Sequence, residues 1–183
     1  MRDSDPRRWG LLASWADRAS ARAFERSAVA ARWRRLAEET WRAELRPLSA
    51  RGRWSGRQPF GTPAGGRWDG PVAAVTRARL RPARACSFWR SVPPVAAALR
   101  EQPGLRLAVG IGEAPVGLQG TFSLWESGAA LAGFAYRGAA HAEAIRRTPV
   151  ERWYAEELFA RFAVEAVTGS FAGRPVSLAG TGP

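Results

Sequence analysis

The sequence predicts an α+β fold, and three observations carry this prediction. Short segments with alternating apolar residues, typical of half-buried strands, stand beside longer Ala-rich segments with helical spacing. From Val72 onward these segments follow the order strand, helix, strand, strand, helix, strand, which is that of a ferredoxin-like unit. A chain of 183 residues, 46% hydrophobic and 24% charged, can bury a core, so wholesale disorder is excluded.

The first fifty residues predict a strand, a helix and a strand. The apolar run at 9–15 predicts a buried strand, and the Ala- and Arg-rich segment 17–39 predicts an amphipathic helix. Alternation at 41–49 predicts a second strand that ends near Pro47. Segment 51–70 is dense in Gly and Pro, which predicts a long loop.

The remainder is more regular. Strands are expected at 72–80, 105–111, 120–125 and 159–168, and helices at 85–101 (interrupted by Pro93 and Pro94), 127–147 and 149–158. The chain therefore divides into a partial ferredoxin-like repeat at 1–50, a loop at 51–70, a complete repeat at 71–168 and a polar tail at 169–183.

A weak internal repeat supports this division. Trp15 is followed nine residues later by Phe24, and Trp125 is followed nine residues later by Phe134. The first half then matches only the strand–helix–strand end of a second ferredoxin-like unit, which leaves a sheet edge near 9–15 open. An open apolar edge invites pairing with another strand, so we expect a homodimer.

Composition excludes several classes of site. One cysteine, Cys86, excludes an internal disulfide and a Cys-rich zinc site, and one histidine, His141, excludes multi-histidine metal centres. The first ten residues lack the apolar run of a secretory signal, and no uncharged run reaches the roughly 18 residues of a membrane-spanning helix. We expect a cytoplasmic protein, with peripheral membrane contact as the alternative.

The positive charge is concentrated in one half of the chain. All 28 basic residues are Arg; residues 1–100 hold 21 of them against 8 acidic residues, a net +13, whereas residues 101–183 carry a net −1. A basic half suits nucleic acid, anionic lipid or an acidic protein. None of the usual nucleic-acid-binding motifs accompanies it, so nucleic acid is not expected.

One histidine stands on an apolar helix face. The spacing of three and four residues places on one face of helix 127–147 the residues Leu131, Phe134, Gly138, His141 and Ile145. An imidazole beside a small residue on such a face is typical of a proximal haem ligand. The alternative is a core histidine bonded to a backbone carbonyl. Cys86, between Arg84 and Arg90, is the rival axial ligand as a thiolate.

Five sequence blocks carry a resemblance to a known family. They are RGRWSGRQPF (51–60), FWRSVPP (88–94), GIGEAPVGLQGTFSLW (110–125), FAYRGAAHAEAIRR (134–147) and WYAEELFARF (153–162). In this order they resemble the spheroidene monooxygenase family, which is similar to the dimeric α+β-barrel haem proteins. The resemblance implies haem b with His141 as the axial ligand of its iron, and insertion of a keto oxygen into acyclic carotenoids with dioxygen and external electrons. Family members carry an additional strand before Trp9.

Other residues receive supporting roles. Gln119 is the candidate catalytic residue, because a polar donor must orient bound dioxygen. Arg51 and Arg53 are candidates to pair with the haem propionates. Candidates to line the haem are Phe122, Trp125, Phe134 and Gly138, in a layer between helix 127–147 and strand 120–125, with loop 51–70 as its lid. Core packing or a surface position is the alternative for each of these residues.

The sequence thus supports two functions. The first is a haem-dependent monooxygenase in carotenoid biosynthesis, acting on an apolar substrate and served by a redox protein that docks on the Arg-rich half. The second is a non-enzymatic α+β-barrel module that binds haem or another apolar ligand. Haem chemistry of another kind, such as dehydration, is a variant of the first.

Overall fold

A computed structural model describes residues 8–61, 63, 66–113, 118–137 and 139–177, with the backbone alone at 113, 118, 137 and 139–141. Five strands form one antiparallel sheet in the order β1-β5-β2-β4-β3, and a short sixth strand pairs with β5. The strands are β1 (Trp41–Gly52), β2 (Val72–Leu80), β3 (Leu105–Glu113), β4 (Leu118–Trp125), β5 (Tyr154–Phe171) and β6 (Arg174–Pro175).

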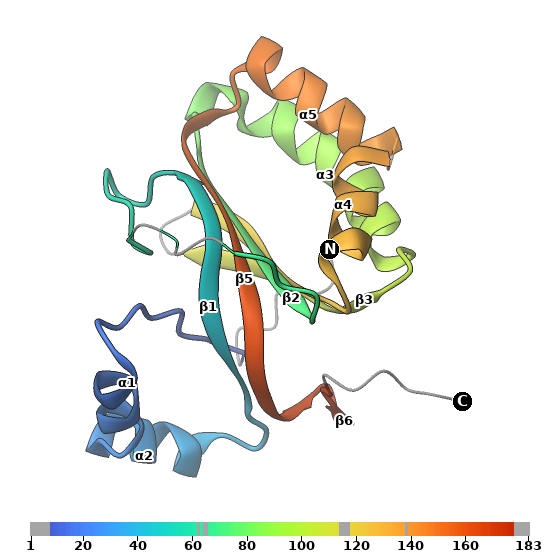
Figure 1. The fold of residues 1–183 in the computed structure, drawn as a ribbon. Helices are drawn as coiled ribbons and strands as arrows, with labels where there is room; N and C mark the ends of the chain where they lie inside the picture. Colours follow the sequence, from blue (N-terminus) through green and yellow to red (C-terminus); the bar gives the residue numbers. More distant parts are fainter. Residues whose placement is uncertain (1–7, 62, 64–65, 114–117, 138, 178–183) are drawn as a thin grey trace.

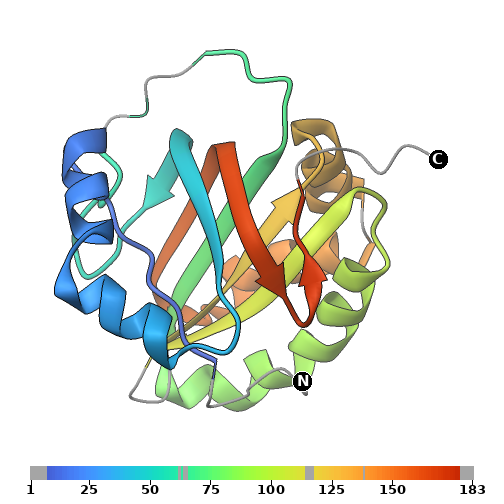
Figure 2. The same ribbon diagram turned by 90° about the horizontal axis from the view of Figure 1, so that it is seen from below.

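The helices form two separate groups (Figures 1 and 2). Helices α3 (Ala85–Arg100), α4 (Gly128–Arg137) and α5 (Ala139–Glu151) cover one face of the sheet, after a short 3-10 turn at Pro82–Arg84. Helices α1 (Arg18–Glu25) and α2 (Ala28–Leu36) lie beside the β1 edge. None of the described helices is long and apolar enough to cross a membrane.

Each face of the sheet carries its own core. The helix-covered face holds a cluster around Val72, Trp125 and Phe134, on which Val95 and Leu99 of α3 pack. The other face, here called the outer face, holds a larger cluster around Ala73, Val75, Leu124, Ala160, Phe162 and Val164. Neighbouring residues of one strand therefore belong to different cores, as the alternation of a pleated strand requires.

The predicted α+β class and the ferredoxin-like order are confirmed. The unit β2-α3-β3-β4-α4/α5-β5 has the strand order β5-β2-β4-β3, and β1 extends it at the β5 edge. Strand β2 has the predicted bounds. Helix α3 runs through Pro93 and Pro94 without the expected interruption.

The N-terminal predictions need two corrections. Residues 9–15 form no strand: Trp9 packs on Trp33, with ring centroids 4.7 Å apart, and Trp15 packs on Phe24. The apolar run is thus used in ring packing rather than strand pairing. The single helix expected at 17–39 is two helices, because Ser27 caps a second one by accepting a hydrogen bond from the Ala30 N–H.

The C-terminal helices also differ from the prediction. Helices α4 and α5 together span most of the predicted helix 127–147; residue 138, between them, lies outside the described residues. Pro149 lies inside α5 rather than at the start of a further helix, and β5 begins at Tyr154, five residues before the predicted strand. Ile145, expected to share the buried face of Phe134, is 49% exposed, whereas Phe134 is 7% exposed. The predicted apolar face therefore does not stay buried as far as Ile145.

Candidate functional site

The layer between the sheet and helices α3–α5 has a floor of small side chains. Strand register places these side chains on the helix-covered face at the middle of β2, β3 and β4: Ala74, Thr76, Ala108, Gly110, Thr121 and Gln119. Except for exposed Gly110 they are half-buried, even though helices cover this face. We call this set the small-residue floor. Most of its side chains are much smaller than the aromatic rings at the two ends of the layer.

Aromatic clusters close the layer at both ends of the floor. At one end Trp125 stacks on Phe134 of α4, with ring centroids 5.6 Å apart. At the other end Phe88 of α3 meets Trp153 edge-on at 5.7 Å and also contacts Tyr154. Burial, more than the nearby Glu157 carboxylate, raises the pKa of Tyr154 to about 12, so its hydroxyl stays protonated at neutral pH.

Gln119 contributes the only side-chain amide of the small-residue floor. Its Nε2 is buried and has no hydrogen-bond partner among the described residues. A buried amide donor without a partner costs free energy, so such a group is found where something else accepts its hydrogen bond. The neighbouring Gly120 is required by backbone packing, because a Cβ there would lie 2.0 Å from the Thr76 carbonyl oxygen. The close approach at Gly120 thus keeps β4, which carries Gln119, tightly paired with β2.

Two residues predicted to line one cavity lie on opposite faces of β4. Trp125 faces the helices, whereas Phe122 belongs to the outer-face cluster and meets Trp41 edge-on at 5.4 Å. The expectation that Phe122 looks into the helix–sheet layer together with Gln119 is wrong, because residues three apart on a strand point to opposite sides. Trp125 and Phe134 fill one end of that layer with their own stacked rings.

The RGRWSG segment is anchored on an ion pair between buried Arg77 and half-buried Glu156, which sequence reasoning missed. The Arg77 side chain, 2% exposed, donates from Nη1 to Oε1 of Glu156 at 3.1 Å. The Ser55 and Gly56 N–H groups donate to the same carboxylate at 2.8 and 2.7 Å. These bonds, led by that from Gly56, hold the pKa of Glu156 below its usual value of 4.5. The Trp54 ring lies 4.5 Å from the Arg77 guanidinium.

The two arginines proposed for propionates occupy different places. Arg51 is exposed and lies with its guanidinium 4.8 Å from the ring centroid of Phe159, which pairs with Thr76 of the floor. Arg53 is exposed and donates to the Gly56 carbonyl at 3.4 Å within the turn. Arg51 is therefore the one that borders the small-residue floor.

The structure describes the side chain of Cys86 but not that of His141, the two residues predicted as axial ligands. Gly138 and the side chain of His141 lie outside the described residues; position 141 is in the first turn of α5, whose main neighbours are α3 and α4. Cys86 is exposed. An exposed thiol does not suit an axial ligand in a dry pocket. Among the described residues, no group of three or more His, Cys, Asp or Glu side chains could hold a metal ion.

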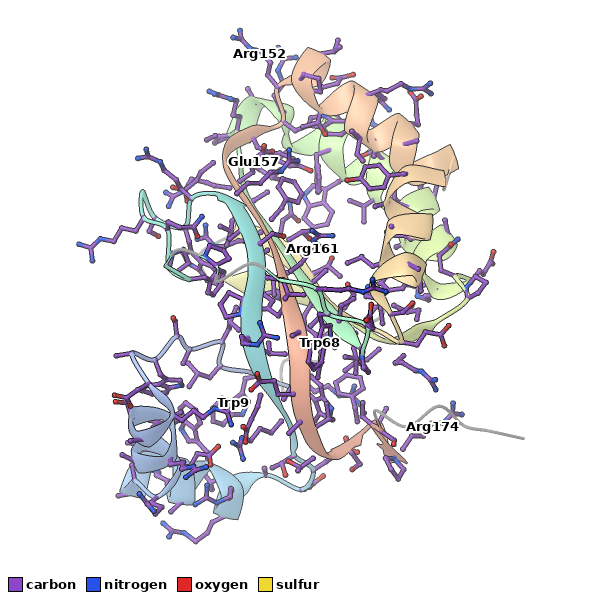
Figure 3. All side chains as sticks on the ribbon, in the orientation of Figure 1. Trp9, Trp68, Arg152, Glu157, Arg161 and Arg174 are labelled. Carbon is purple, nitrogen blue, oxygen red and sulfur yellow. The ribbon has the colours of Figure 1, made fainter. Side chains whose placement is uncertain are left out.

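A separate cavity of about 200 Å³ lies beside the filled end of the layer. Trp68, Leu131 and Arg161 are among its lining residues, and Figure 3 shows Trp68 and Arg161 near the middle of the sheet. Trp68 comes from the end of the predicted loop and donates from Nε1 to the Pro71 carbonyl at 2.7 Å. The predicted lid segment thus contacts the sheet next to the stacked pair, and its role as a lid stays a prediction.

Comparison with curated proteins decides the family. The chain is 40% identical over 172 residues to a spheroidene monooxygenase of Rhodobacter capsulatus, which covers 91% of this chain and 70% of the relative. It is 43% identical to the spheroidene monooxygenase of Rubrivivax gelatinosus and 36% identical to that of Cereibacter sphaeroides, each over 91% of this chain. The chain belongs to the spheroidene monooxygenase family. No family model matches it.

Membership confirms the resemblance and the class of protein. The relatives that show this family are all named as monooxygenases, which are oxidoreductases. It spans 64% of the Rubrivivax relative and 52% of the Cereibacter relative. The activity of those longer proteins is therefore carried over only as a proposal.

Solved structures agree with the fold. A candidate monooxygenase of Fusobacterium nucleatum superposes with a TM-score of 0.50 at 12% identity, covering 84% of this chain and 67% of that one. SnoaB, a cofactor-independent oxygenase of Streptomyces nogalater, reaches a TM-score of 0.43 at 18% identity over 53% of this chain and 95% of that one. At such identities the likeness concerns the fold alone.

Proposed function

We propose that the chain is a haem-dependent monooxygenase that inserts oxygen into an apolar, carotenoid-type substrate, with His141 as the axial ligand of the iron. The observation that carries this proposal is the small-residue floor with the unpartnered Gln119 amide, closed at both ends by aromatic clusters. The names of the relatives support the substrate class.

Three features of the described residues support a haem group in this layer. A flat macrocycle needs small neighbours, and the floor offers alanine, glycine and threonine side chains over three adjacent strands. The buried Gln119 Nε2 supplies a donor that has no partner among the described residues. Arg51, exposed next to Phe159 at the border of the floor, suits a propionate, which favours guanidinium contacts.

Each group then has a defined task. His141 would hold the iron through an imidazole nitrogen, and the haem, when bound, would supply the activation of dioxygen. The Gln119 amide donates a hydrogen bond into the layer and orients a polar oxygen there. The clusters around Trp125 and Trp153, which are 0% and 1% exposed, exclude water from the two ends. Arg residues of the basic half attract an acidic electron donor.

The first test concerns the axial ligand. The purified chain, reconstituted with haem, should show a Soret band, and His141→Gly should lose it and regain it with added imidazole. Cys86→Ser is the matched control and should keep the band. An unchanged Soret band in His141→Gly, or no haem uptake by the unaltered chain, would overturn the assignment.

The second test concerns the floor. Thr76→Leu adds bulk on the small-residue floor and should abolish haem uptake while circular dichroism still shows a folded chain. Thr168→Leu places the same change at an exposed position of β5 and should leave uptake unchanged. With isotope-labelled dioxygen, the haem-loaded chain should transfer label to an acyclic carotenoid. Transfer of label by the haem-free chain would contradict the proposal.

A further inference from the structure

Residues 8–37 form an N-terminal helical hairpin that exposes large apolar side chains. This hairpin consists of an extended segment, α1 and α2, and its only buried residue is Ala30. Exposed fractions are 60% for Trp9, 53% for Leu11, 42% for Trp15, 51% for Val29 and 69% for Leu36. Isolated exposed apolar residues are ordinary, but five large ones within thirty residues form a surface that suits another apolar phase.

The same hairpin is strongly basic. Between residues 8 and 37 it carries seven Arg against Asp17 and Glu25, a net +5. Five of these arginines are exposed and form no ion pair with any described residue: Arg22, Arg26, Arg32, Arg34 and Arg35. The guanidinium groups are therefore free to meet anionic groups outside the chain.

The hairpin stands apart from the rest of the fold. Ion pairs join it to the sheet, from Arg18 to Glu165 of β5 and from Glu25 to Arg42 of β1. Leu12 packs against the outer-face cluster, but the aromatic rings of the hairpin pack mainly on one another. Figure 3 shows Trp9 between the hairpin and the sheet, away from α3–α5. Apart from Leu12, the apolar side chains of the hairpin are thus not part of the two core clusters.

We propose that the N-terminal helical hairpin docks the protein on the surface of an anionic lipid bilayer. Amphipathic helices with Arg on the polar side and Trp or Leu on the other lie in the membrane interface, where tryptophan is favoured. Guanidinium groups pair with lipid phosphates, often through two hydrogen bonds. The inference is carried by residues 8–37 and does not depend on haem, so the two proposals can fail separately.

A lipid surface explains both features of the hairpin better than a folded protein does. An acidic protein would satisfy the arginines, but a folded partner needs a shaped and continuous contact area. The apolar residues here are distributed over a coil and two short helices, of eight and nine residues. A bilayer adapts to such a surface. An acidic protein and a second copy of the chain are outcomes that the test separates.

The experiment uses sedimentation of the full chain with vesicles of phosphatidylcholine alone or mixed with phosphatidylglycerol. Binding is expected only with phosphatidylglycerol, and it should weaken as salt rises. The triple variant Arg32→Gln, Arg34→Gln, Arg35→Gln should lose about tenfold or more in vesicle affinity. The matched control Arg79→Gln, Arg152→Gln, Arg174→Gln removes three exposed arginines outside the hairpin and should bind as the unaltered chain does.

A second pair of variants tests the apolar part. Trp9→Ser with Leu11→Ser should weaken binding to the same vesicles, whereas Trp89→Ser, at a 45% exposed tryptophan of α3, should not. Circular dichroism confirms that each variant is folded. Equal binding by all variants would overturn the proposal. A second outcome would also overturn it: the unaltered chain does not bind vesicles, and light scattering shows a dimer that the Trp9/Leu11 variant loses. A second copy of the chain would then cover the hairpin.

Discussion

Two Trp–Phe pairs, each nine residues apart in the chain, make similar contacts in different surroundings. Trp15 and Phe24 have ring centroids 5.1 Å apart, and Trp125 and Phe134 have them 5.6 Å apart. Trp125 is 0% exposed and Phe134 7%, whereas Trp15 is 42% exposed. In both cases a tryptophan before a helix meets a phenylalanine within it. The spacing determines the contact, and the elements packed around the pair determine its burial.

The surroundings differ because of position in the sheet. Trp125 ends β4, an interior strand with α3 and α4 above it, so Val95 and Leu99 complete its cluster. Trp15 precedes α1 in a hairpin whose links to the sheet include exposed ion pairs. The same pair thus stabilises the core in one region and, in the other, contributes to the surface that we propose for lipid.

The largest effect is expected from removing the two tryptophans. Trp125→Ala should lower the free energy of unfolding by about 3–5 kcal/mol, because it leaves a cavity in a packed cluster. Trp15→Ala should lower it by less than about 1 kcal/mol, since Trp15 is 42% exposed and lies outside both core clusters. Denaturant unfolding measures both. Equal losses would show that the hairpin is as much a part of the core as β4 is.

The next effect concerns the ion pairs in the two regions. Arg77→Ala should cost about 3 kcal/mol, because the Glu156 carboxylate would lose a partner in a site where the Arg77 side chain is 2% exposed. Arg18→Ala should cost about 1 kcal/mol or less, because the Arg18 side chain is 70% exposed and screened by water. Thermal unfolding of both variants at low and high salt distinguishes them. The loss of stability caused by Arg18→Ala should shrink at high salt, because salt screens the exposed pair. A loss that does not change with salt would contradict this comparison.

The smallest effect is the loss of stability at low pH that two carboxylates, Glu156 and Asp17, cause when they are protonated. The pKa of Glu156 is lowered chiefly by the Gly56 N–H, and that of Asp17 chiefly by the Ser20 N–H. Because both folded pKa values lie below the unfolded ones, each group stabilises above its ordinary pKa, 4.5 or 3.8, and this stability is lost as pH falls through the folded value.

The readouts of the two carboxylates differ. Glu156→Gln should flatten the fall in global stability below pH 4.5, measured by denaturant unfolding at several pH values. Asp17→Asn should change only the helical signal of α1, because Asp17 caps that helix. A change of global stability with Asp17→Asn would instead couple the hairpin to the sheet.

Much of the fold could be predicted because its signals are local. Alternation along 72–80 determines β2, since its two sides meet two different cores. The run at 9–15 misled for an equally local reason: apolar residues satisfy burial by packing rings as well as by pairing strands, and the sequence does not distinguish these.

The site was predictable only in part. Gln119 was chosen because an oxygenase site needs a polar donor to orient dioxygen; its buried Nε2, without a partner among the described residues, agrees with that choice. Phe122 was assigned to the wrong layer because three residues along a strand reverse the face. Arg77 and Glu156 are 79 positions apart in the chain and carried no motif, so only the β2–β5 pairing brings them together.

By itself, the sequence determined the α+β class, the family and the short-range contacts, such as the two Trp–Phe pairs, because these depend on residues a few positions apart. Tertiary structure alone decided which pair is buried, which face each strand residue occupies and where the small-residue floor lies. The physical reason is that burial and register are properties of neighbouring strands, and a one-residue shift exchanges the two faces. In this chain that exchange separates Trp125 of the helix–sheet layer from Leu124 of the outer face.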